Sequence, residues 1–195
     1  MFKKTSHTLS LLFRITRTAC ANISFPLEQK SASVLQFCRR YIGCGIGRWC
    51  QVAAKYAKRV VGVDYDEEWI RIARETTTAE NVEYILGDAT KELKGQKFDL
   101  ALLSHVIEHI DDSDKLLQEA KEFADTLCIE VPDFTADPLN WVSLKHGYQF
   151  YAEGDHVREY TLETLQNQLE KNGWKILHHE KNNGSMVAFA AQSEK

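Results

Sequence analysis

The sequence predicts an α/β fold built on a seven-stranded, mostly parallel sheet with helices on both faces. Two observations lead to this prediction. A glycine-rich stretch at 43–47 precedes an alanine-rich segment of helical length at 48–59, and a short apolar run at 60–64 then ends in an acid. This order of glycine loop, helix and strand with a terminal carboxylate is the usual α/β unit that binds a nucleoside. Further along, 98–104 is nearly continuously apolar, which is typical of a parallel strand covered on both faces.

The remaining elements follow along the chain. We expect strands over 34–37, 60–64, 82–89, 98–104, 127–131, 174–178 and 185–191. Besides 48–59, we expect helices over 113–125 and 161–172. Ser113 and Thr161 can cap these helices with their hydroxyls, and Asn172 followed by Gly173 ends the second one. Pro132 ends the fifth strand, because proline cannot donate to the sheet ladder.

The glycine loop and Asp64 predict where a nucleoside binds. Glycine has no Cβ, so backbone at 43–47 can approach a ligand closely. Asp64 ends an apolar strand and can accept hydrogen bonds from two ribose hydroxyls. The spacing is G-x-G-x-G with Arg48 at the sixth position, where a dinucleotide fingerprint has glycine. The sequence therefore favours a nucleoside ligand other than a dinucleotide.

This loop resembles the cofactor loop of class I S-adenosylmethionine (SAM) methyltransferases. The segments 82–89 and 98–110 are similar, in order and spacing, to further motifs of that superfamily, especially its small-molecule and ubiquinone-biosynthesis branches. The resemblance covers 34–192 and implies a Rossmann-like sheet that closes with an antiparallel pair of strands. It also implies that Asp88 meets the adenine amino group and that the Ala89 backbone N–H faces the ring. The cofactor-binding residues that we assign are Gly43, Cys44, Gly45, Gly47, Asp64, Tyr65, Asp88, Ala89 and Ser104.

One segment departs from the resemblance. The superfamily usually has an acid two residues before the first glycine, near the amino group of the cofactor, and this chain has Tyr41 there. Residues 38–42 look like an insertion between the first strand and the loop. Arg39 and Arg40 fit poorly in a buried strand, because an unpaired buried charge is costly. We therefore expect the unusual stretch at 36–42 to weaken the binding of SAM.

The segment at 105–109, His-Val-Ile-Glu-His, directly follows a predicted parallel strand. It matches the zinc signature of inverted zincin proteases, but a nucleoside-binding unit is not a protease context. In the resemblance, ubiquinone O-methyltransferases and small-RNA 3′-end methyltransferases have Glu-x-x-Glu-His here and use it for a divalent cation. His105 replaces the first acid, and hard cations prefer oxygen ligands. We therefore assign no metal site, and His105, Glu108 and His109 are the candidate ligands should a cation bind.

The sequence indicates a SAM-dependent methyltransferase that acts on a small molecule, with oxygen as the expected acceptor atom. The methyl group of SAM is already electrophilic, so the protein has to align the reacting atoms and exclude water. A hydroxyl acceptor also needs a base, and His109 and His156 are the candidates. Two alternatives stay open. One is a metal-dependent RNA 2′-O-methyltransferase, which the similarity of 155–161 to the later histidine segment of the RNA enzymes favours. The other is a non-catalytic binding module with a degenerate cofactor loop.

Composition limits the class of protein. The chain has 195 residues and 44% hydrophobic residues, enough for one domain with a proper core. A net charge of −4 makes nucleic acid an unexpected partner, and no apolar run is long enough to span a bilayer. The five cysteines are odd in number and scattered, which favours a reducing compartment and hence the cytoplasm. The oligomeric state is left open.

Two segments stand apart from the expected core of the methyltransferase domain at 31–195. The first, 1–30, is basic and rich in serine and threonine. It predicts either a helix that packs over the cofactor cleft or, over 1–27, a presequence for the mitochondrial matrix. The second is a long, aromatic-rich connection at 133–160, which we expect to form a lid-like insertion. Its aromatic side chains either cover the acceptor or anchor the insertion to the sheet.

Overall fold

The computed structural model of the protein describes residues 33–38, 44–147, 155–182 and 184–193. The N-terminal segment 1–30, Tyr41 and Gly43 lie outside the described residues, so the expectations that concern them stay predictions. Within the described part of the chain, no helix combines the length and the apolar character needed to cross a bilayer.

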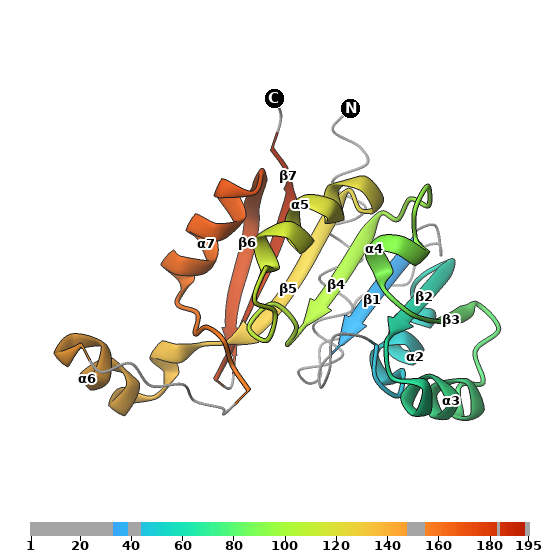
Figure 1. Ribbon diagram of the computed structural model, residues 1–195, viewed down its shortest axis with the longest axis horizontal. Helices are drawn as coiled ribbons and strands as arrows, with labels where there is room; N and C mark the ends of the chain where they lie inside the picture. Colours follow the sequence, from blue (N-terminus) through green and yellow to red (C-terminus); the bar gives the residue numbers. More distant parts are fainter. Residues whose placement is uncertain (1–32, 39–43, 148–154, 183, 194–195) are drawn as a thin grey trace.

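A single sheet organises the domain (Figure 1). Its strands are β1 (Ser33–Cys38), β2 (Arg59–Asp64), β3 (Val82–Leu86), β4 (Leu100–Ser104), β5 (Thr126–Pro132), β6 (Trp174–Asn182) and β7 (Ser185–Gln192). They form a seven-stranded sheet in the order β3-β2-β1-β4-β5-β7-β6. Strands β1 to β5 pair in parallel, whereas β7 runs antiparallel to both β5 and β6. The predicted α/β fold, with its mostly parallel sheet and its antiparallel pair, is confirmed.

Helices lie on both faces of this sheet: α2 (Arg48–Ala54), α3 (Glu67–Thr76), α4 (Ala89–Glu92), α5 (Ser113–Phe123) and α7 (Leu162–Lys171). Two separate hydrophobic clusters show which helix covers which face. Leu103 of β4 packs in one cluster with side chains of α4, α5 and α7, whereas Leu102 packs in the other with α2 and α3. Successive side chains of a strand point to opposite faces, so one apolar strand serves both clusters. Packing on both faces explains why the run at 98–104 is nearly continuously apolar.

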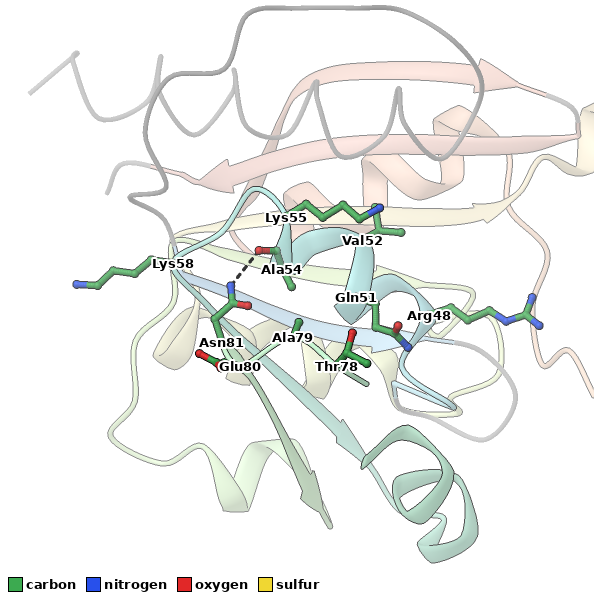
Figure 2. A pocket seen from close by; sticks show the side chains of 10 residues that line it. All are labelled: Arg48, Gln51, Val52, Ala54, Lys55, Lys58, Thr78, Ala79, Glu80 and Asn81. Carbon is green, nitrogen blue, oxygen red and sulfur yellow. Dashed lines mark hydrogen bonds between the residues drawn. The ribbon is translucent and has the colours of Figure 1, made fainter. Parts of the chain in front are cut away.

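The helix after the glycine loop is shorter than predicted. We expected it over 48–59, and α2 ends at Ala54. The Asn81 side-chain amide donates a hydrogen bond of 2.9 Å to the Ala54 carbonyl oxygen (Figure 2). It donates another, also of 2.9 Å, to the Ala57 carbonyl oxygen. The last carbonyls of a helix lack partners within the helix itself. A side chain from the loop before β3 supplies them here, which a local sequence pattern does not reveal.

The connection at 133–160 contains a short 3-10 helix, η1 (Phe134–Ala136), and the helix α6 (Pro138–His146). Phe134 and Tyr160 are buried, and the Phe134 N–H donates to the Tyr160 carbonyl oxygen at 2.9 Å. The Tyr160 hydroxyl also donates to Gln168 of α7 at 2.6 Å. These two aromatic residues therefore anchor the connection. In Figure 1, α6 projects away from the sheet, and its function as a lid stays a prediction.

Candidate cofactor and acceptor site

The sheet order places the candidate site at the carboxyl ends of the parallel strands. Strand β1 lies between β2 and β4, so the chain passes to one side of β1 first and returns later to the other. In open α/β sheets, ligands bind outside the carboxyl ends of the strands at such a switch point. The loop at 44–47, Asp64 at the end of β2 and Ser104 at the end of β4 all lie at this edge.

Asp64 is tied directly to the glycine loop. Its carboxylate is buried, with Oδ2 accepting the Gly45 N–H at 2.6 Å and Oδ1 accepting the Asp66 N–H at 3.0 Å. Burial raises the pKa of Asp64, although the backbone N–H groups act in the opposite direction. Each carboxylate oxygen can accept more than one hydrogen bond, so acceptor capacity remains beside the loop. This arrangement fits a ribose diol, and the contact itself stays a prediction.

The Cys44 thiol points into the sheet. It would lie 2.9 Å from a Cβ added to Gly62 of β2, and the Cys50 thiol would lie 2.8 Å from the same atom. A hydrogen bond with Cys50 and burial raise the pKa of the Cys44 thiol far above its usual range. A buried thiol of this kind is unreactive, so only the backbone of Cys44 is suited to contact a cofactor.

Gly47 is required by packing as well as by backbone conformation. Its φ is +75°, and an added Cβ would overlap the Tyr84 hydroxyl. We expect Gly47→Ala to lower the free energy of unfolding by about 2–5 kcal/mol, because left-handed strain and overpacking add. Gly95→Ala is the matched control, since Gly95 has a φ of +82° and no atom within 4 Å of an added Cβ. That variant should lose only about 1–2 kcal/mol. Equal losses in chemical denaturation would show that contact with Tyr84 is not the reason.

A cavity of about 160 Å³ includes Tyr65, Asp88 and Ala89 in its lining. Asp88 caps α4, since its Oδ1 accepts the Thr90 N–H at 3.0 Å and the Thr90 hydroxyl at 2.8 Å. Burial opposes ionisation of Asp88, but the hydrogen bonds from Thr90 hold its pKa below the usual value. The cavity follows the ends of β2 and β3, which is where the resemblance implies an adenine ring. Adenine recognition by Asp88 stays a prediction beside this observed capping role.

A larger cavity, of about 790 Å³, lies between α2 and residues 78–81 (Figure 2). Its lining includes the cations of Arg48, Lys55 and Lys58. None of the residues predicted to bind the cofactor or the acceptor lines this cavity. The location of the cofactor at the glycine loop, Asp64 and the smaller cavity therefore stays a prediction, and the larger cavity does not support it.

The turn after β4 is held by β5. The Ser104 hydroxyl, predicted to contact the cofactor, donates to Glu130 Oε2 at 2.6 Å. His105 follows with a φ of +54°, in the left-handed region, and its N–H donates to the Glu130 carbonyl oxygen at 2.8 Å. Both polar groups at the end of β4 are thus bound to Glu130, a residue that the sequence analysis did not single out.

Glu108, His109 and His156 form a compact cluster. One potential ligand atom from each lies within 4.8 Å of the others, and the two imidazole rings meet edge to face with centroids 4.9 Å apart. Glu108 Oε2, His109 Nε2 and His156 Nε2 are buried and have no hydrogen-bond partner among the described residues. A buried polar atom without a partner is costly, and a divalent cation would satisfy all three atoms together. The residues present therefore fit a cation.

Each imidazole of the cluster is oriented by its other nitrogen. His156 Nδ1 contacts Glu159 Oε1 at 2.8 Å, and His109 Nδ1 contacts the Asp155 carbonyl oxygen at 3.3 Å. Histidine ligands of metal ions usually have such an outer partner, which fixes the tautomer and the direction of the free nitrogen. The sequence analysis did not identify Asp155 and Glu159 as partners. The spacing of three between His156 and Glu159 is the signal that could have identified the second.

A network of hydrogen bonds brings the two halves of the cluster together. The Val157 N–H donates to the Glu108 carbonyl oxygen at 2.9 Å. The Arg158 guanidinium donates to the carbonyl oxygens at 110–111 and, at 2.7 Å, to the Ser113 hydroxyl. Ser113 is therefore not the cap of α5 that we predicted, and Asp112 fills that position.

The structure changes the set of candidate ligands. His109 and His156, predicted as candidate bases, lie together with their rings in edge-to-face contact. His105, predicted as a candidate ligand, lies outside the cluster, and its Nδ1 contacts Glu108 Oε1 at 3.1 Å. Among the described residues, this cluster thus offers two imidazole nitrogens and one carboxylate oxygen to a cation.

Comparisons with known proteins agree with the fold. Residues 41–124 match a family described as a methyltransferase domain. Ajmaline N-methyltransferase of Rauvolfia serpentina is 32% identical over 120 residues, which cover 58% of this chain and 40% of that protein. A ubiquinone biosynthesis O-methyltransferase of Chelativorans sp. (strain BNC1) is 33% identical over 84 residues, covering 42% of this chain and 33% of that protein. The chain thus spans 40% or less of the length of these two curated relatives.

A solved structure shows the same fold over nearly the whole chain. Magnesium protoporphyrin IX methyltransferase of Synechocystis PCC 6803, with bound SAH, has a TM-score of 0.65 and 14% identity. The match covers 97% of this chain and 84% of that one. Residues 41–124 are therefore similar to methyltransferase domains, and the chain has the fold of this solved methyltransferase.

Proposed function

We propose that the protein transfers the methyl group of SAM to a hydroxyl group of a small molecule. The observation that supports this most is that a nucleoside-binding edge and the cluster of Glu108, His109 and His156 both follow the carboxyl ends of neighbouring parallel strands. A methyl acceptor placed between them would face both the cofactor and polar groups that can handle its proton. One relative is named as an O-methyltransferase, and another as an N-methyltransferase.

The reaction needs alignment and one proton acceptor. The acceptor oxygen attacks the methyl carbon, the carbon–sulfur bond breaks, and its electron pair stays on the sulfur of S-adenosylhomocysteine. The hydroxyl proton passes to a base. The His109 side chain is 13% exposed, whereas the His156 side chain is fully buried. We therefore assign the base to His109 and a supporting role to His156.

A second version of this site uses a divalent cation. Glu108 Oε2, His109 Nε2 and His156 Nε2 would hold it. When bound, such a cation would act as a Lewis acid toward the acceptor hydroxyl. His109 would then be a ligand instead of the base.

A transfer assay with labelled SAM tests the proposal. The chain is incubated with methyl-labelled SAM and a panel of phenols, catechols, aliphatic alcohols and amines, and both labelled product and S-adenosylhomocysteine are measured. We expect transfer to hydroxyl acceptors. Transfer to amines alone would contradict the assignment to oxygen. An RNA oligonucleotide in the panel tests RNA 2′-O-methylation, and SAM binding without any transfer would favour the non-catalytic module.

A further inference from the structure

His105 adopts a conformation that requires an explanation. Among the described residues it is the one non-glycine residue with a positive φ. A side chain with a Cβ is strained in the left-handed region, and such strain often occurs at functional sites. His105 lies at the carboxyl end of β4, directly beside the cluster of Glu108, His109 and His156.

Two carboxylates flank the His105 ring. Its Nδ1 lies 3.1 Å from Glu108 Oε1, and its Nε2 lies 3.9 Å from Glu130 Oε1. The backbone of β5 fixes the turn, because the His105 N–H donates to the Glu130 carbonyl oxygen. The left-handed conformation of His105 thus lets its ring reach Glu108, although the His105 backbone is hydrogen-bonded to β5.

The contact with His105 involves only one of the two carboxylate oxygens of Glu108. Oε1 contacts His105, whereas Oε2 is buried and has no hydrogen-bond partner among the described residues. The Glu108 side chain is only 1% exposed, so bulk solvent has little access to Oε2. Glu108 therefore offers one oxygen to the cluster, in addition to one nitrogen from each of two histidines.

We propose that His105 is a positioning residue that fixes Glu108 as a one-oxygen ligand, so that Glu108, His109 and His156 bind a divalent cation that accepts imidazole. Zn²⁺, Co²⁺ and Fe²⁺ belong to this class, and sites of two histidines and one carboxylate suit them. Mg²⁺ demands octahedral oxygen ligands and should be discriminated against. This inference deepens the proposed function, because the cation would occupy the proposed acceptor site.

Two substitutions at His105 separate its ring from its backbone. Asparagine tolerates the left-handed region, and its short side-chain amide can donate to Glu108 in place of Nδ1. Glycine accepts the same backbone conformation without strain but has no donor. We expect His105→Asn to bind the cation within about threefold of the parent. His105→Gly should bind it about 10–100-fold more weakly, because removal of the outer partner of a metal ligand usually lowers metal affinity by that factor.

Cation binding is measured on the full chain without SAM or acceptor. The protein is freed of metal with a chelator and titrated calorimetrically with Zn²⁺, Co²⁺ and Mg²⁺, and the visible absorption of Co²⁺ reports its ligands. Glu108→Gln keeps the size of the side chain but removes the charge, and it should abolish tight binding. His156→Ala should do the same. His146→Ala changes an exposed histidine of α6 and should bind like the parent.

Several outcomes would overturn the inference. The first is that the parent binds no divalent cation. The second is that the parent binds Mg²⁺ as tightly as it binds Zn²⁺ and Co²⁺. The third is that His105→Gly binds the cation with the same affinity as the parent. If His156→Ala does not fold, Glu108→Gln decides. Methyl transfer without cation binding would contradict this inference alone, and cation binding without methyl transfer to any acceptor would contradict the proposed function alone.

Discussion

Replacing His109 with alanine should lower turnover by about 10²–10⁴-fold, the usual contribution of a positioned proton acceptor. The His109 ring is oriented by the Asp155 carbonyl oxygen, and its Nε2 is buried without a partner among the described residues. SAM affinity should stay near that of the parent, because the described hydrogen bonds of Asp64 and of the loop at 44–47 do not involve this ring. Single-turnover kinetics and calorimetry with SAM measure the two effects separately.

The matched control is His179→Ala, which changes an exposed histidine of β6. This variant should turn over like the parent. A His109→Ala variant within tenfold of the parent would remove His109 from the mechanism. If exogenous imidazole restores the turnover of His109→Ala, His109 acts as the base. If a chelator abolishes the activity of the parent instead, and Zn²⁺ or Co²⁺ restores it, His109 acts as a cation ligand.

Replacing Asp64 with alanine should weaken SAM binding by about 1.5–3 kcal/mol, or about 10–150-fold, the value of hydrogen bonds to a charged acceptor. Asp64 also accepts the Gly45 N–H, so its removal releases the loop as well. Asp64→Asn keeps one acceptor oxygen and should lose less. Calorimetric titration with SAM measures these losses.

Asp125→Ala is the control for removal of a carboxylate, since Asp125 is exposed and precedes the amino end of β5. It should bind SAM like the parent. Circular dichroism and chemical denaturation must show that the Asp64 variants are folded. An unchanged affinity in folded Asp64→Ala would contradict the placement of the cofactor.

Much of the fold was predictable because local patterns determine it. Apolar runs with glycine, proline or acid at their ends predicted each strand of the sheet within a few residues. The hydroxyl of Thr161 and the Asn172–Gly173 pair predicted α7, and the structure has the Thr161 cap. The end of α2 was not predictable, because Asn81 determines it from a distant loop.

The sequence by itself determined which chemical groups lie at the carboxyl edge of the sheet, since Asp64 and the segment at 105–109 each follow a strand. Only the tertiary structure decided which groups meet. The turn after β4 places the His105 ring against Glu108, and the last part of the 133–160 connection places His156 against His109. Periodicity encodes the face on which a side chain lies, whereas contact between distant segments depends on hydrogen bonds such as those of Arg158.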